Sequence, residues 1–198
     1  MKPQPLTKRQ QQALQTKQHI YQVGLGLMEK KGYHGTTIEQ ISKAAKVSVG
    51  AFYHHFQSKE DILSQIYQDA DAYFLNQVSQ QLTAGSAPAR IVEYFDRYAA
   101  YNVQVGVETM KVLYHAENRW FVKKHRGMQE VLLAIIEQGR EDGQLSTDLS
   151  SEKIAEYLFI SARGVVFNWC LLNGQYDLQA QMQDYMQRLV QAFCSLLK

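Results

Sequence analysis

The chain has 198 residues, of which 45% are hydrophobic, so it can bury a core of ordinary size. This composition excludes disordered and collagen-like chains, and only three prolines over this length favour helices over a strand-rich fold with many short turns. The formal net charge is +2, but residues 1–59 hold nine basic and two acidic residues, whereas the remainder holds twelve basic and seventeen acidic ones. The first third is therefore suited to approach a polyanion, although a solvated basic face would have the same composition.

Nothing in the sequence indicates export, a membrane anchor or a metal. The first residues, MKPQPLTKRQQQ, lack the apolar core of a secretory signal, and no run of about eighteen apolar residues occurs. We therefore expect a cytoplasmic protein with no membrane partner. Cys170 and Cys194 have no CxxC partner and no histidine at ligand spacing, which predicts reduced, mostly buried thiols and no metal site.

The N-terminal segment predicts a flexible arm followed by a helix. Residues 1–15 are polar, rich in Gln and Lys and carry two prolines, which is typical of a flexible basic arm. Apolar positions then recur at helical spacing from about Thr16 to Gly32. Gly24 and Gly26 weaken this helix by about 1 kcal/mol each relative to Ala, which indicates close contact with a neighbouring helix.

Residues 36–56 have the layout of a helix-turn-helix motif: a short helix, a tight turn and a second short helix. Thr36 or Thr37 can cap the first helix, with Glu39 or Gln40 returning the capping bond, and Ser48 can cap the second. Pairs of short helices are also common packing units, so this layout alone is weak support for DNA binding.

The second short helix has an inward and an outward side. Phe52 and Phe56 lie four residues apart and are expected to point into the domain. Val49, Tyr53 and His54 are then left on the solvent side, where they can meet a partner.

The rest of the sequence alternates helical spacing with glycine, proline and asparagine breaks. One helix is predicted from Ser58 to about Leu82. Pro88 suits the first turn of the next helix, which Gly106 interrupts, and Asn173 with Gly174 ends a later one. Further helices are expected over residues 108–118, 120–141, 151–173 and 176–197.

The stretch KVSVGAFYHHFQSKEDIL, residues 46–63, resembles the tetracycline-repressor (TetR) family, whose pattern there reads roughly GVSxGxxYxHFxSKexL. The preceding junction, Lys31, Gly32, Tyr33, Thr36 and Thr37, is similar to the family's KGY…TT pattern. The resemblance implies an all-α fold of about nine helices. It would comprise a three-helix DNA-binding domain over residues 16–60 and a helical ligand-binding and dimerisation domain over residues 61–198.

Several residues carry over from the family pattern as contacts to the DNA backbone. Helix N-termini at Thr37 and Ser48 can bind phosphates, and Tyr53, His55 and Lys59 would hold the phosphate backbone without reading sequence. Two of these residues have a structural alternative, because Tyr53 can pack against the first helix and Lys59 can serve the fourth.

Base contacts would fall to small residues at the start of the recognition helix. Val49 and Ala51 can touch thymine methyls but offer no bidentate hydrogen bonds, so part of the specificity would come from DNA shape. Where the family usually has glycine, Lys46 stands at the turn, and a positive φ there would cost lysine about 1 kcal/mol. The predicted DNA-binding residues are Thr36, Thr37, Lys46, Ser48, Val49, Gly50, Ala51, Tyr53, His54, His55 and Lys59.

The partners follow from the same resemblance. The last two helices would pack against their copies as a four-helix bundle, with Ser161, Ala162 and Gly164 allowing close approach. Two recognition helices must meet successive major grooves about 34–36 Å apart, which implies a homodimer on a pseudopalindromic operator in double-stranded DNA.

The middle of the chain is rich in aromatic residues with polar tips, which suit a pocket for a small lipophilic or aromatic ligand. An aromatic stripe is also typical of a plain core. The candidate ligand-binding residues are Tyr94, Tyr98, Tyr101, Tyr114, His115, Trp120, Phe121, Phe167 and Trp169. A ligand would favour a spacing of recognition helices that no longer fits the operator.

Two other functions are weighed against a ligand-released repressor. An enzyme is disfavoured because the sequence has no HExxH, P-loop or GxSxG motif, and no catalytic residue, cofactor or metal is expected. The alternative is a helical adaptor or ligand-binding module that does not bind DNA. The intact Tyr53, His55 and Lys59 set argues against that alternative.

Overall fold

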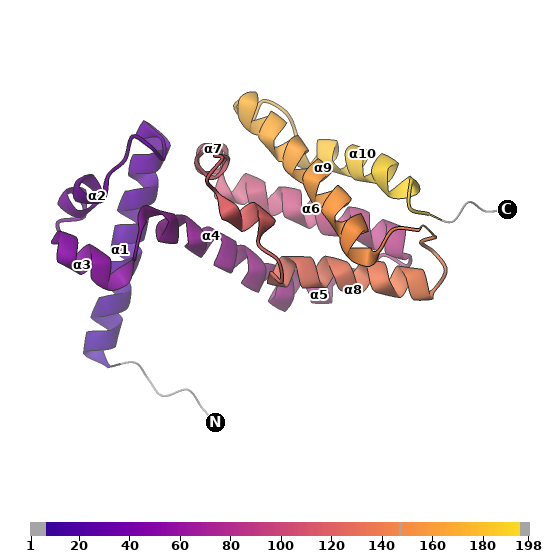
Figure 1. The fold of residues 1–198 in the computed structure, drawn as a ribbon, viewed down its shortest axis with the longest axis horizontal. Helices are drawn as coiled ribbons and strands as arrows, with labels where there is room; N and C mark the ends of the chain where they lie inside the picture. The colour runs from indigo at the N-terminus through magenta and orange to yellow at the C-terminus, as the bar shows by residue number, and fades with distance from the viewer. Residues whose placement is uncertain (1–6, 147, 195–198) are drawn as a thin grey trace. The chain divides into compact units, whose positions relative to one another are not determined.

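The computed structural model describes residues 7–146 and 148–194, and within them the chain is helical, as the sequence predicts. It divides between Ile66 and Tyr67, rather than at residue 60, into an N-terminal and a C-terminal unit (Figure 1). The N-terminal unit holds α1 (Lys8–Lys31), α2 (Ile38–Ala44), α3 (Val49–His55) and the start of α4 (Lys59–Tyr73). The C-terminal unit continues with the π-helical turn η1 (Phe74–Val78), α5 (Ser79–Gln81), α6 (Ala87–Val105), α7 (Val107–Leu113), the 3-10 turn η2 (Arg119–Val122), α8 (Gly127–Glu141), α9 (Ser151–Leu171) and α10 (Leu178–Gln191).

The first helix begins at Lys8, well before the expected start near Thr16. Thr7 caps it in a complete capping box with Gln10, and the residues that follow are strong helix formers, so the helix extends beyond its buried part. Residues 7–15 are all exposed. The prediction of a flexible arm is therefore wrong for these residues, and its first part, residues 1–6, lies outside the described residues.

The N-terminal unit is held by apolar side chains from α1 to α4. Ile20, Ile41, Phe52 and Ile62 are fully buried. A Cβ at Gly24 would lie 2.7 Å from the side chain of Ile62, so the close helix contact predicted for this glycine is confirmed. Gly26 has nothing within 4 Å of such an atom, and the same prediction is wrong there.

The C-terminal unit is built around α6, which contacts α7, α8, α9 and α10. Ser86 caps α6 and Pro88 lies in its first turn, as predicted. Ile91, Tyr94 and Phe95 on its inner face are fully buried. The core of this unit is therefore packed with aromatic and branched side chains.

Several predicted helices differ in the structure. The helix expected over residues 108–118 ends at Leu113, and the one expected over residues 176–197 ends at Gln191. The helix expected to reach Leu82 does so, but through the π-helical turn η1, which interrupts α4 and α5. The helix expected over residues 120–141 is broken, because His125 has a φ of 56° and α8 starts only at Gly127. A Cβ at Gly127 would collide with the side chain of Leu75, which is 43% exposed and would have to move, so α8 approaches the π-helical turn closely at this glycine.

The predicted breaks at Gly106 and at Asn173 with Gly174 are confirmed, and all three residues have positive φ. Among the described residues, α9 is the one helix long and apolar enough to cross a membrane by length and composition. Half of its most apolar window is buried inside the protein, and a core helix of a soluble protein has the same properties.

Candidate DNA interface and ligand cavity

The turn between α2 and α3 is closed by Lys46 in the left-handed conformation, with a φ of 56°. The N–H of Lys46 donates to the carbonyl of Lys43 at 3.2 Å, and that of Val47 donates to Ser42 at 3.0 Å. These are the two bonds of a Schellman motif, which usually has glycine at this position. Of the two possibilities for this position, the structure has the positive φ, and the Lys46 side chain is exposed.

The N-terminal end of α3 presents small residues to solvent. Ser48 caps the helix and its Oγ accepts a hydrogen bond from the N–H of Ala51 at 3.0 Å. Phe52 is fully buried, whereas Val49 and Gly50 are exposed. A Cβ at Gly50 would meet only Ser48 Oγ, at 3.8 Å, so packing within the protein does not require glycine there. This end of α3 can therefore approach a partner closely.

The two threonines before α2 have different environments. Thr37 is exposed and caps α2, and Gln40 completes the predicted capping box. Thr36 is only 1% exposed, and its hydroxyl donates to the carbonyl of Gly32 at 3.0 Å. Thr36 therefore holds the end of α1 against α2, and the prediction that it faces DNA is wrong for this structure.

The outer side of α3 carries Tyr53, His54 and His55. Tyr53 is 53% exposed, His54 is exposed and His55 is partly buried. Partial burial lowers the pKa of His55, and the nearby charges of His54 and Lys17 lower it further. His55 is therefore mostly neutral at pH 7 in the free protein, where its ring can still donate one hydrogen bond.

Lys59, at the first residue of α4, is engaged inside the N-terminal unit. Its ammonium donates to the carbonyl oxygens of Tyr33 at 2.7 Å and Thr36 at 2.8 Å, and it lies 4.2 Å from the centre of the Tyr33 ring. Burial lowers its pKa. Lys59 thus closes the loop between α1 and α2, which is a structural contact that the sequence alone did not predict.

The helix-turn-helix geometry agrees with a family match over the same residues. Residues 20–66 match the model of a family described as bacterial regulatory proteins, tetR family, and residues 121–192 match one described as YsiA-like protein, C-terminal region. The chain belongs to the TetR family. It is a DNA-binding, ligand-responsive transcriptional regulator.

Characterised TetR relatives match over most of their length. The chain is 26% identical over 162 residues to the HTH-type transcriptional repressor DhaR of a Mycobacterium species, covering 76% of this chain and 80% of that protein. It is 25% identical over 203 residues to the HTH-type transcriptional regulator AcrR of Shigella flexneri, covering 94% and 93%.

Solved structures share the fold. The transcriptional regulator FadR of Bacillus subtilis, crystallised with stearoyl-CoA, superposes with a TM-score of 0.71 at 20% identity, over 87% of this chain and 97% of FadR. FadR of Thermus thermophilus, a TetR-family repressor crystallised with lauroyl-CoA, has a TM-score of 0.65 at 21% identity, over 92% and 96%.

Some of the predicted ligand residues lie in the core of the C-terminal unit instead. Tyr94 is fully buried and donates its hydroxyl to the carbonyl of Met128 at 2.7 Å. Burial raises the pKa of Tyr94 and of Tyr98, which is 7% exposed. Trp169 is buried against Gly174 at the end of α9. These three rings hold helices together.

Two further candidate ligand residues, Tyr101 and Trp120, stack on tyrosines of α4. The rings of Tyr101 and Tyr73 are 5.4 Å apart, and those of Trp120 and Tyr67 are 5.3 Å apart and nearly parallel. Both pairs are internal packing contacts of the C-terminal unit. They connect α6 and η2 to the part of α4 that follows Ile66.

The remaining candidates surround one cavity of about 400 Å³, the aromatic cavity. The ring of Tyr114 lies 4.9 Å from that of Phe121 and 5.4 Å from that of Phe167. The Tyr114 hydroxyl donates to the carbonyl of Arg163 at 3.1 Å, and burial raises its pKa. The cavity is lined by Tyr114, His115, Ala116, Phe121, Val122, Arg163 and Phe167.

A second cavity of about 460 Å³, the apolar groove, lies between η2, α8 and α9 and shares three residues with the aromatic cavity. The shared residues are Phe121, Val122 and Arg163. Leu133, Ala155, Phe159 and Ile160 add apolar wall, and the other lining residues are Lys124, His125, Gln129, Glu130, Glu152 and Glu156.

Arg163 is a lining residue that the sequence pattern did not predict, although one signal was present. It is the one cation between Ile154 and Leu171, in a helix that is otherwise largely apolar. In the structure its side chain is half-buried and lines both cavities. A cation inside a long apolar stretch was therefore the available hint of a polar site.

Proposed function

We propose that this TetR protein is a dimeric repressor that acts in the cytoplasm, binds a pseudopalindromic operator through α3 and is released by a small lipophilic or aromatic ligand. The observation that carries DNA recognition is the open N-terminal end of α3. Its small residues are exposed, while Phe52 anchors the helix from the other side.

In this proposal the residues around α3 divide into two groups. Tyr53 and His55 hold phosphates, and Lys46 and the capped N-termini of α2 and α3 add to the same backbone contacts. Val49, Gly50 and Ala51 meet base edges, with His54 beside them. Lys59 acts mainly by fixing the loop before α2, because its ammonium already has two carbonyl partners.

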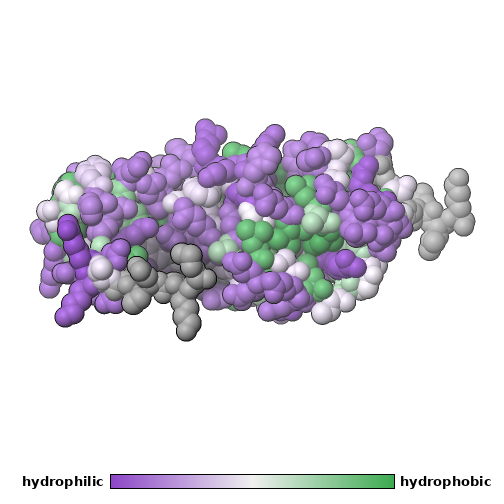
Figure 2. Space-filling view, turned by 90° about the horizontal axis from the view of Figure 1, so that it is seen from below, coloured by the Kyte–Doolittle hydropathy of each residue, from purple (hydrophilic) through white to green (hydrophobic). Residues whose placement is uncertain are grey.

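The dimer would form through α9 and α10. Figure 2 shows hydrophobic side chains gathered at the surface of the C-terminal unit as seen from below. Several exposed apolar residues belong to α9 and α10. On α9, Tyr157, Ile160 and Leu171 are exposed at helical spacing, with Gly164 between them. These residues lie on one side of the helix, as a packing face requires.

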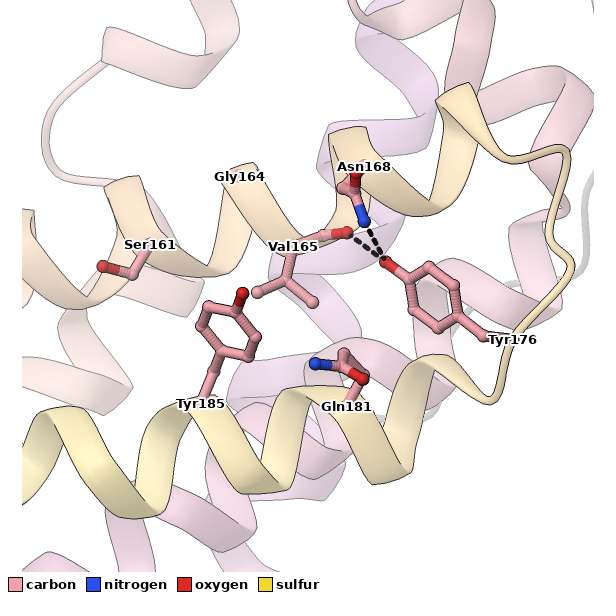
Figure 3. Close-up of a pocket in the computed structure, with 7 residues that line it drawn as sticks. All are labelled: Ser161, Gly164, Val165, Asn168, Tyr176, Gln181 and Tyr185. Carbon is pink, nitrogen blue, oxygen red and sulfur yellow. Dashed lines mark hydrogen bonds between the residues drawn. The ribbon is translucent and has the colours of Figure 1, made fainter.

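A shallow hollow of about 170 Å³ lies beside that face, between α9 and α10 (Figure 3). Ser161 and Gly164 leave space on α9, and the ring of Tyr185 extends from α10 toward it. Tyr176 closes one end by donating its hydroxyl to the carbonyl of Val165 at 2.9 Å. Of the small residues expected on this face, Ala162 is instead fully buried in the unit.

The ligand would occupy the aromatic cavity and the apolar groove. Their volumes fall within the range of small-molecule sites. The two FadR proteins were crystallised with acyl-CoA, so this fold accommodates a long apolar chain in those relatives. A ligand here would bind with different affinities to two conformations of the dimer, which differ in the spacing of their recognition helices.

Operator selection tests the proposal. Selection from random duplex DNA should enrich a palindrome, and binding to it should weaken linearly with the logarithm of salt concentration. Tyr53→Phe should weaken operator and random DNA alike, whereas Tyr73→Phe on α4 should weaken neither. Failure to enrich any DNA sequence would favour the helical adaptor instead.

The dimer face is tested separately by analytical ultracentrifugation. Ile160→Glu places a charge at a position that is 51% exposed, and Val103→Glu on α6 provides a matched control at 46% exposure. The first variant should be monomeric at concentrations where the second remains dimeric. Equal dimerisation of both variants would exclude this face of α9.

A further inference from the structure

Arg163 is a cation that the protein itself does not neutralise. None of the ion pairs among residues 7–146 and 148–194 includes it. Its Nη1 donates to the carbonyl oxygen of Phe121, which leaves most of its five N–H donors available. An arginine whose fork is only partly satisfied at a cavity wall is suited to bind a carboxylate through two parallel hydrogen bonds.

The same guanidinium stands at the junction of two apolar cavities. It lines both the aromatic cavity and the apolar groove, and it lies 5.8 Å from the centre of the Phe121 ring. Next to it, Tyr114 and Phe167 provide ring faces, and Phe159 and Leu133 continue the apolar wall along α9 and α8. A ligand with one charged end and one lipophilic end would satisfy both features.

Basic and acidic side chains both line the groove around this junction. The segment from Arg119 to Arg126 contains no acidic residue, and both Lys124 and His125 line the groove near η2. The acidic residues of the groove are Glu130 on α8 and Glu152 and Glu156 on α9. Glu156 pairs with Lys153 at 3.0 Å and lies seven residues before Arg163, or about 10 Å along the helix axis.

We infer that these cavities bind a lipophilic carboxylic acid, with its carboxylate on Arg163 and its aryl or alkyl part against Tyr114, Phe121 and Phe167. The inference rests on the proposed function, because it names the ligand class of the same site. Arg163 then selects for the anionic head group, and the rings and apolar wall select for the tail.

Isothermal titration calorimetry on the full chain tests the head group with a matched pair of probes, 6-phenylhexanoate and 6-phenylhexan-1-ol. The carboxylate should bind at least about tenfold more tightly than the alcohol, because only it forms charge-assisted hydrogen bonds with Arg163. Arg163→Met should remove that difference and leave alcohol binding unchanged, and Arg163→Lys should restore part of it. Arg188→Met, at an exposed arginine of α10, should behave like the parent protein.

Circular dichroism melting of each variant would confirm that it is folded before titration. No binding of the carboxylate, equal binding of the two probes, or equal losses for both in Arg163→Met would overturn the inference. Operator release by some uncharged compound, without carboxylate binding, would overturn this ligand class but leave the proposed repressor intact. Tight, Arg163-dependent carboxylate binding that never releases the operator would support the site and contradict ligand-controlled repression.

Discussion

The ammonium nitrogen of Lys59 lies 2.7 Å from the carbonyl oxygen of Tyr33, 26 residues earlier in the chain. With its second bond to Thr36, this contact ties the start of α4 to the loop that leads into α2. A residue that the family pattern marks for DNA contact therefore also shapes the domain that binds DNA.

Lys59→Met should destabilise the protein by about 2 kcal/mol, because two partly buried carbonyls lose a charged donor. Urea unfolding would measure this change, with Lys43→Met, at an exposed lysine of α2, as the control. The salt dependence of DNA binding should change little for a correctly folded Lys59 variant. A stable variant with a flattened salt dependence would instead assign Lys59 to a phosphate.

Lys46→Gly should stabilise the protein by about 1 kcal/mol, because glycine adopts the positive φ of the Schellman turn without strain. Lys46→Ala keeps the strain and loses the same charge, so it separates the two effects. Both variants should bind DNA equally weakly if the ammonium contacts a phosphate. Equal stability of the glycine and alanine variants would show that the turn accommodates a side chain at this position without strain.

Features that depend on neighbouring residues could be predicted from the sequence, whereas contacts between distant segments could not. The caps at Thr37 and Ser48 and the break at Gly106 are confirmed, because each depends on neighbouring residues alone. The start of α1 was misplaced because apolar spacing ends near Thr16, whereas helix propensity and a cap extend the helix beyond it.

The contacts that the sequence did not predict join segments far apart in the chain. Aromatic spacing placed Tyr94 and Trp169 with Tyr114 and Phe167. The structure buries the first two in the core and places the last two at the aromatic cavity, because packing between helices decides which rings are covered. Arg163 reaches the carbonyl of Phe121 from a different helix, and no local pattern encodes such a pairing.

DNA binding should strengthen as the pH falls from about 7.5 toward 6. Burial, followed by His54 and Lys17, lowers the pKa of His55 below the usual 6.5, so its charged form is disfavoured in the free protein. A nearby phosphate favours that charged form, and binding then takes up a proton. The stability of the fold should change with pH in the opposite direction from DNA binding. The part of the unfolding free energy that depends on neutral His55 is lost as the pH falls below about 6.5.

Fluorescence anisotropy at several pH values would measure this dependence. His55→Gln should remove most of it, while His19→Gln, at an exposed histidine of α1, should leave it unchanged. A pH dependence of DNA binding that persists in His55→Gln would show that another group takes up the proton. If the parent protein showed no pH dependence, His55 would not contact a phosphate.

The buried ion pair between Arg126 and Asp71 joins the start of α8 to α4 within the C-terminal unit. Arg126 Nε donates to one carboxylate oxygen at 3.1 Å, and the N–H of Met128 donates to the other at 3.2 Å. Asp71→Asn should destabilise the protein by about 3 kcal/mol, because it leaves the 7% exposed Arg126 without its counter-charge.

Urea unfolding measures this loss, and Asp71→Leu combined with Arg126→Met should recover much of it, since an apolar pair removes the desolvated charge altogether. Asp184→Asn breaks the exposed pair with Arg188 on α10 and should change stability little. If Asp71→Asn lowered the free energy of unfolding as little as Asp184→Asn, the result would show that water reaches the Arg126 guanidinium. The link between α8 and α4 would then depend on the close approach at Gly127 instead of on charge.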